Sequence, residues 1–260
     1  AFERGMSLHE AEIDAITSNK DEATFENTIL AYDDAGQMLA QTELVFGMLC
    51  AAETNDRMQA LQEQAMPLLA AHRDKIRLDD KLFVRVKEVY DRRAALGLDA
   101  EQMRLLQKTY DSFVRAGALL DAEQKARLKE INGQLSLTAV KFGNNILAEN
   151  NNFVLELKSD ELDGLPAGIR DAAREKAQQM GKGDKWVFTL HKPSLIPLLT
   201  YSTRRDLREK IYKAYLNRCN NGDEYDNKQL INDFIRLRTE KAHLLGYPSY
   251  AAYVVADEMA

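Results

Sequence analysis

The sequence has few of the residues that interrupt or cross-link a chain. Only five prolines and 13 glycines occur in 260 residues, so long segments contain nothing that would end a helix. The two cysteines, Cys50 and Cys219, lie far apart and lack the spacing of a metal site. Their number argues against a disulfide framework, and we expect two buried, unreactive thiols.

A long apolar run and a strong excess of one charge are also missing. The longest stretch that could suggest a membrane span, residues 38–52, is interrupted by Gln41, Thr42 and Glu43. The chain has 35 lysines and arginines against 41 aspartates and glutamates, and its mean hydropathy is −0.43. Because an acidic, evenly charged surface does not attract phosphate backbones, we expect neither a membrane segment nor a nucleic-acid partner.

The sequence does contain helical periodicity, which dominates residues 1–149. Apolar residues recur at a spacing of three to four, and residues that favour helix N-caps precede most of the runs. The expected helices begin at residue 1, at Thr24, at Asn55, at Asp79 or Asp80, at Asp99 with Gln102 as a capping box, and at Asp121. Each stripe alone is too short for a stable isolated helix, so the helices must pack on one another.

Two of these helices carry apolar stripes that we expect to face the core. The helix from Thr24 is expected to run unbroken to Glu53, and the helix from Asn55 is expected to kink at Pro67. The residues expected to point inward are Ile29, Leu30, Leu39, Leu44, Val45, Phe46 and Leu49 in the first, and Met58, Leu61, Ala65, Leu68 and Leu69 in the second.

The pattern changes at residues 150–152, three consecutive asparagines. Short apolar segments at 153–157 and 185–190 predict two β-strands, joined through a helix that begins at Pro166. Further helices are expected from Pro193, from Thr203 with Asp206 as its cap, from Asp226 or Asn227, and from Ser249. The expected fold is therefore mainly α, with a helical domain over 1–149 and strands plus helices over 150–260.

No catalytic or metal-binding residue can be assigned from the sequence. The four histidines are scattered, and the H-E-x-x-H pattern that places two zinc ligands on one helix face is absent. Neither a G-x-S-x-G motif nor a phosphate-binding glycine loop is present. We expect structural roles for His9, His72, His191 and His243, the first two on solvated faces. Without precedent, the chain would be a helical module with no visible active site.

Several segments in order resemble the thimet-oligopeptidase family of zinc metallopeptidases, in its bacterial peptidyl-dipeptidase (dipeptidyl carboxypeptidase) branch. The matching segments include the opening AFERGM at 1–6, TFENTI at 24–29 and KWVFTL at 185–190. The strongest stretch is RDLREKIY at 205–212, followed by LLGY at 244–247 and AAY at 251–253. Individually these segments are weak signals, but together they span almost the whole chain. The resemblance identifies the chain as the N-terminal portion of such a peptidase.

The resemblance implies an enzyme that removes dipeptides from the C-terminus of short peptides, with helical halves flanking a deep channel. In that family zinc is held by the two histidines of H-E-x-x-H and a downstream glutamate, all C-terminal to this segment. The parent would therefore need zinc and short-peptide substrates. This chain would supply one channel wall to the C-terminal catalytic region, hold no metal and be inactive alone.

Two alternatives remain open at this point: a free-standing helical interaction module, and an oligoendopeptidase of the same family. The sequence opens without methionine and closes within a helical pattern, so both ends are expected to be cut from a longer protein. The expected location is cytoplasmic, with periplasmic as the alternative. If the chain is half of an enzyme, one face should be unusually apolar, because large apolar patches usually mark an interface.

Overall fold

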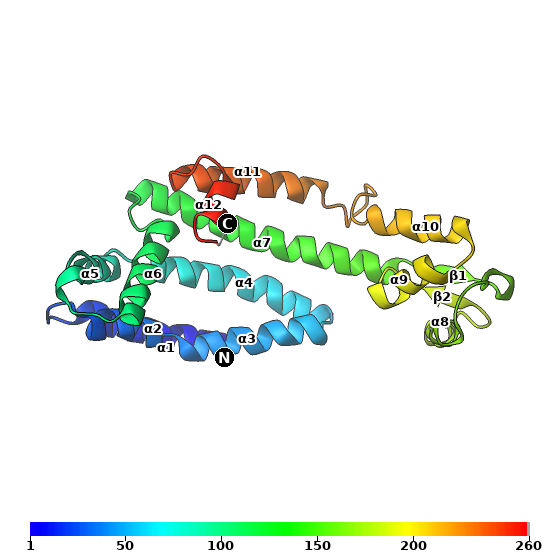
Figure 1. Ribbon diagram of the computed structural model, residues 1–260, viewed down its shortest axis with the longest axis horizontal. Coiled ribbons are helices and arrows are strands. Elements are labelled where there is room, and N and C mark those ends of the chain that lie inside the picture. Colours follow the sequence, from blue (N-terminus) through cyan, green and yellow to red (C-terminus); the bar gives the residue numbers. More distant parts are fainter. Residues whose placement is uncertain (259–260) are drawn as a thin grey trace. The chain divides into compact units, whose positions relative to one another are not determined.

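A computed structural model describes residues 1–258 and is mainly helical, with 73% of the chain in helices (Figure 1). The predicted mainly α class with a small two-stranded sheet is confirmed. The chain divides into two compact units: unit 1 comprises residues 1–140 and the segment from 233 onward, and unit 2 comprises residues 141–232. Two helices, α7 (Ala122–Asn152) and α11 (Lys228–Leu244), contribute residues to both units.

Unit 1 is built from helices whose starts follow the capping residues in the sequence. Asn55 accepts the backbone N–H of Met58, and Asp99 and Gln102 form a reciprocal capping box. Asp121 and Ser249 cap their helices as predicted. The helices are α1 (Phe2–Ser18), α2 (Ala31–Asp34), α3 (Gln37–Ala52), α4 (Asp56–Arg77), α5 (Asp80–Asp91), α6 (Ala100–Ala116) and α12 (Tyr250–Val255).

The core of unit 1 is centred on aromatic rings from α5 and α6. Phe83 stacks on Tyr110 and Phe113 at centroid distances of 5.9 and 6.1 Å, and Tyr90 stacks on Tyr110 at 3.8 Å. Phe113 is completely buried. Such rings bury large apolar areas in preferred geometries, so they fix how α5 and α6 lie against each other.

The unbroken helix expected from Thr24 to Glu53 is wrong. Thr24 does cap the segment, in a box with Asn27, but the chain then forms a π-helical turn (Phe25–Leu30), the short α2 and a break before α3. Gly36 makes the break with a φ of +78°, and its N–H donates to Glu12 Oε2 at 2.7 Å. A Cβ at this position would lie 2.9 Å from Nδ1 of His9, so the break needs glycine.

Part of the predicted core stripe is exposed. Ile29, Leu39 and Leu69 are buried as expected, but Leu61 and Leu68 on α4 are 42% and 57% exposed. On α3 the second half of the stripe also faces outward. We call this the α3 face; its residues are Leu44, Val45, Met48 and Leu49, between 47% and 66% exposed. The prediction that these stripes point wholly inward is therefore wrong, because no described element of unit 1 covers this end of α3.

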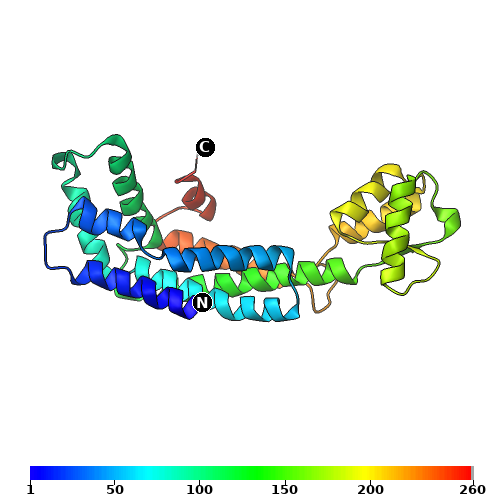
Figure 2. The same ribbon diagram turned by 90° about the horizontal axis from the view of Figure 1, so that it is seen from below.

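Unit 2 contains the two predicted strands, β1 (Leu155–Leu157) and β2 (Trp186–Phe188), which pair antiparallel with Leu155 opposite Phe188. Burial alternates along β1: Leu155 and Leu157 are buried, while Glu156 is exposed and pairs with Lys182 at 2.9 Å. The helix α8 (Ala167–Gln179) packs on β2 (Figure 2). Two more helices, α9 (Lys192–Tyr201) and α10 (Arg205–Leu216), complete the unit.

Some local expectations in unit 2 are corrected. Thr203 does not cap α10; its hydroxyl donates to Asp163 Oδ2 at 2.6 Å, and Asp206 instead pairs with Arg204. Cys219 is buried, but it lies beyond α10 with a φ of +56°, and Cys50 is only half-buried. Burial raises the pKa of both thiols, so neither is a ready nucleophile. No helix within residues 1–258 is long and apolar enough to cross a membrane.

Candidate functional site

A cavity in unit 1 has a volume of about 770 Å³ and is lined by α4, α6, α7, α11 and the segment around α12. Its walls are mainly charged. Five cations (Arg73, Arg77, Lys108, Arg115 and Lys241) face three carboxylates (Asp74, Asp111 and Asp257). This excess of positive charge makes the cavity the best candidate for a binding site, because few structural needs gather so many cations in one hollow.

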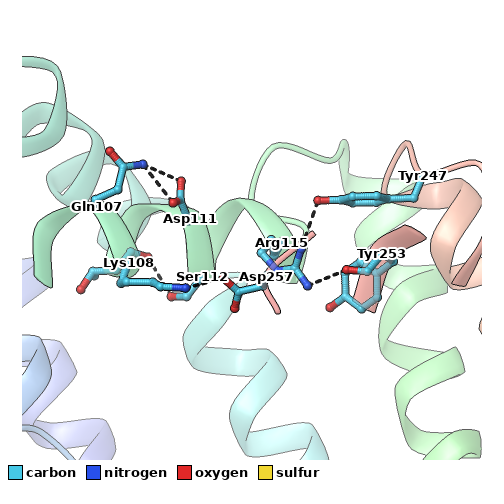
Figure 3. A network of polar contacts seen from close by, with 9 residues as sticks. Gln107, Lys108, Asp111, Ser112, Arg115, Tyr247, Tyr253 and Asp257 are labelled. Carbon is cyan, nitrogen blue, oxygen red and sulfur yellow. Dashed lines mark hydrogen bonds and ion pairs between the residues drawn. The ribbon is translucent and has the colours of Figure 1, made fainter. Parts of the chain in front are cut away.

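Several of the eight charged groups have a side-chain partner, and Figure 3 shows those of Lys108, Asp257 and Asp111. Lys108 pairs with Asp257, and Arg73 pairs with Glu43. Asp111 accepts both of its hydrogen bonds from the Gln107 amide, each 2.9 Å long. Among the described residues of the cavity, the groups without a direct ion pair are therefore Asp74, Asp111, Arg77, Arg115 and Lys241.

Arg115 is held by neutral groups only. Its guanidinium donates to the backbone oxygen of Tyr253 at 2.7 Å and to the hydroxyl of Tyr247 at 3.3 Å (Figure 3). The same guanidinium lies 4.6 Å from the centroid of the Tyr253 ring. Contacts of this kind orient the arginine without a direct ion pair, and three of its five N–H donors are still available. The Asp257 carboxylate is near enough for the Arg115 charge to help lower its pKa, after the larger effect of Lys108.

An amide relay fixes the floor of the cavity. The Asn132 side chain donates to Asp74 Oδ1 at 2.8 Å and accepts from Lys241 Nζ at 2.7 Å, so both ends of the amide are used. Burial raises the pKa of Asp74 and lowers the pKa of Lys241, in each case disfavouring the charged form. The relay separates the two charges by one amide instead of letting them form a direct ion pair.

A second polar centre joins α1 to α4. His72 is buried, and its Nε2 lies 3.1 Å from Nδ1 of His9, while its Nδ1 lies 3.4 Å from Glu10 Oε1. Burial, and then the neighbouring His72, lower the pKa of His9. One ring must donate and the other accept, so two protonated rings would repel each other at this contact. The expectation of a solvated face is wrong for His72, which is buried, whereas His9 is half-exposed.

The sequence is similar to known peptidases. Residues 198–260 match the model of peptidase family M3. The chain is 37% identical to the dipeptidyl carboxypeptidase of Escherichia coli and 35% identical to that of Salmonella typhimurium, over 100% of its own length and 38% of theirs. It is 34% identical to an organellar oligopeptidase A of Arabidopsis thaliana, over 63% of the chain and 21% of that protein. This chain belongs to peptidase family M3.

The M3 chain spans only 38% of the length of the dipeptidyl carboxypeptidases and corresponds to their N-terminal part. Peptidases of family M3 are zinc metallopeptidases. Within residues 1–258, no three histidine, cysteine, aspartate or glutamate side chains are grouped as ligands for a metal ion. The remaining histidines, His191 and His243, are exposed, and His191 contacts only Thr189 among the hydrogen-bond partners found for it in that range.

The basic cavity is a feature that sequence reasoning missed in this M3 chain. Its charged residues come from helices separated by up to about two hundred positions, and each one by itself has the pattern of a solvated helix face. One weak signal was present: Arg115 and Lys241 both occur near the buried ends of amphipathic helices, where a charge needs a partner or a ligand.

Proposed function

We propose that this M3 chain is the N-terminal part of a zinc metallopeptidase that releases dipeptides from the C-terminus of oligopeptides. The observation that carries the proposal is the 37% identity to a dipeptidyl carboxypeptidase over the whole chain. The relative from Salmonella typhimurium, 35% identical over the whole chain, carries the same name.

In this proposal the chain forms one wall of the substrate channel, and zinc is held elsewhere in the same protein. The partners are short peptides and the C-terminal catalytic region, and the location is cytoplasmic, with periplasmic as the alternative. In the same proposal, residues 1–149 form the helical wall. Residues 150–260 form the segment that leads toward the catalytic region. The chain alone would lack activity, because catalytic zinc needs three protein ligands and an open position for water.

A second candidate is an oligoendopeptidase of the same family. It is favoured by the 34% identity to the organellar oligopeptidase A, although that match covers only 63% of the chain. The two candidates differ in whether a free C-terminal carboxylate on the substrate is required.

The test compares two substrates with the full-length protein that contains this chain. One is an N-acetylated octapeptide with a free C-terminus, and the other is the same peptide as a C-terminal amide. Mass spectrometry should detect successive loss of dipeptides from the first and no cleavage of the second. Internal cleavage of both peptides would establish the oligoendopeptidase instead. Activity that a zinc chelator leaves unchanged would overturn both candidates.

A second measurement addresses the 260-residue chain alone. We expect metal analysis to find no stoichiometric zinc in it, and we expect it to release no dipeptide from the acetylated peptide with or without added zinc. Circular dichroism on the same sample shows whether the chain is folded. Chelator-sensitive cleavage by the folded chain would contradict the proposed division of labour.

A further inference from the structure

The cavity of unit 1 contains three cations that form no direct ion pair with a carboxylate of the described residues. Within residues 1–258, no carboxylate oxygen lies within 4.0 Å of a side-chain nitrogen of Arg77, Arg115 or Lys241. Arg77 and Lys241 are near enough to the Asp74 carboxylate to attract it, but neither forms a direct ion pair with it. Arg115 and Lys241 donate hydrogen bonds to neutral oxygens. Unpaired cations that share a hollow repel one another, so their convergence needs a compensating charge.

Two of these cations are placed against the same ring. The guanidinium carbon of Arg115 lies 4.6 Å from the centroid of Tyr253, and Nζ of Lys241 lies 6.0 Å from it. Burial raises the pKa of the Tyr253 phenol, which keeps its O–H as a neutral donor. Guanidinium, ammonium and phenol therefore present donors from three different helices toward one region of the cavity.

The carboxylates of the cavity do not compete for these donors. Asp111 is taken up by Gln107, and Asp257 by Lys108, at the edge of the group (Figure 3). Asp74 reaches Lys241 only through the Asn132 amide. With Glu43, the partner of Arg73, the five cations of the cavity face four carboxylates, which leaves a formal excess of one positive charge.

We propose that this cavity binds a small multivalent oxyanion, of the phosphate or polycarboxylate class, between Arg115, Lys241 and Arg77. A cavity of about 770 Å³ is large enough for such an anion with several water molecules. Arginine presents a planar fork that matches two oxygens of one group, and lysine adds a point charge from the other side. The proposal does not depend on the peptidase activity.

Binding would join α6, α4 and the α11–α12 segment through one ligand, since the three cations come from these elements. A multivalent anion satisfies them together, whereas a monocarboxylate can reach only one or two. The anion also restores the balance of charge in a partly desolvated hollow, where each contact is stronger than at an open surface.

The experiment is isothermal titration calorimetry on the full-length protein, at constant ionic strength set with sodium chloride. The ligands are inorganic phosphate, citrate and, as a monovalent control, acetate. We expect one site per chain for phosphate or citrate, and binding of acetate at least tenfold weaker. An absence of binding by both multivalent anions overturns the proposal, including the case in which another segment of the protein fills the cavity.

Substitutions that remove one positive charge each test whether the anion binds in this cavity. Arg115→Gln and Arg77→Gln should each weaken the binding of the multivalent anion at least tenfold. Arg77 is exposed, so its replacement tests the site even if Arg115→Gln fails to fold. Arg57→Gln is the matched control, because it removes the same charge from an exposed position on α4 outside the cavity. Equal weakening in Arg57→Gln would show general charge attraction and overturn the assignment, whereas a change below twofold supports it.

Discussion

The two units differ in the kinds of side chain that form their buried cores. Unit 1 packs aromatic rings between helices, with Phe83, Tyr110 and Phe113 in successive contact. Unit 2 packs mainly aliphatic side chains around a two-stranded sheet, with Leu155, Leu157 and Leu198 almost fully buried, and adds the buried ring of Phe188. A two-stranded ribbon is marginal by itself, so the second core depends on the helices that cover it.

Because the two units have separate cores, we expect their free energies of unfolding to be measurable separately. The two buried clusters share no residue, and the only tryptophan of the chain, Trp186, lies in β2 of unit 2. Its fluorescence therefore reports on unit 2, while far-UV circular dichroism is dominated by the helices of unit 1. Urea denaturation followed by both signals compares the two cores directly.

The largest effect is expected from Phe113→Ala. Removing a fully buried ring from the stack should lower the free energy of unfolding of unit 1 by about 3–5 kcal/mol. The midpoint measured by circular dichroism should fall, while the midpoint measured by Trp186 fluorescence stays in place. Leu119→Ala, at a position 62% exposed, is the control and should leave both midpoints unchanged. Equal shifts in both signals would mean that the two units unfold together, and would refute the expectation that they unfold separately.

The reverse experiment is Leu157→Ala in β1. This side chain is completely buried, and its loss should cost unit 2 about 2–5 kcal/mol. Here the fluorescence midpoint should fall and most of the circular dichroism should persist. Glu156→Ala, on the opposite face of the same strand, should shift the midpoint far less, because it removes only an exposed ion pair. If the two substitutions had equal effects, the assigned face of β1 would be wrong.

A smaller effect is expected within unit 1 from Gly36→Ala. The left-handed conformation costs an alanine about 1–2 kcal/mol, and the new methyl group would also press on the His9 ring. Gly97→Ala separates these causes, since Gly97 has a φ of +66° but open space around its Cα. Thermal unfolding should show a larger loss for Gly36→Ala. Equal losses would indicate that His9 moves away freely.

The smallest effect concerns pH and the histidine pair. His9 has a lowered pKa in the fold, so the unfolded chain binds more protons, and stability falls as pH drops below about 6.5. We expect His9 to contribute a loss of less than about 1 kcal/mol between pH 7.5 and 5.5, because the half-exposed ring is screened by solvent. His9→Gln should flatten the pH profile of the melting temperature. His243→Gln, at an exposed position, should not, and matching profiles for wild type and His9→Gln would refute this origin.

Much of the fold could be predicted because its signals are local. Asn55, Asp99 and Asp121 start helices through hydrogen bonds to residues three positions away, which a sequence displays directly. The strands at 153–157 and 185–190 were likewise marked by short apolar segments between turns. The break at Gly36 was missed because it depends on Glu12 and His9, which lie more than twenty positions earlier.

The histidine pair and the charged cavity could not be predicted from local sequence patterns. His9 and His72 lie 63 positions apart and come together only because α1 packs on α4. Lys241 reaches Asn132 across 109 positions. A charged residue on an amphipathic helix looks the same in sequence whether it faces solvent or a cavity. Which of the two it faces is decided by how the helices pack, and their periodicity does not specify this.

The amide relay has a consequence for the chemical ageing of the protein. Asn132 precedes Gly133, a dipeptide prone to deamidation, in which the glycine nitrogen attacks the side-chain carbonyl and ammonia is lost. In α7 the helical backbone holds that nitrogen away, and Asp74 and Lys241 hold the amide. The second such pair, Asn221 with Gly222, lies in an exposed bend and is held only through its amide nitrogen by Glu149. On storage, the spontaneous gain of negative charge should therefore begin at the exposed bend, while the cavity floor keeps its amide.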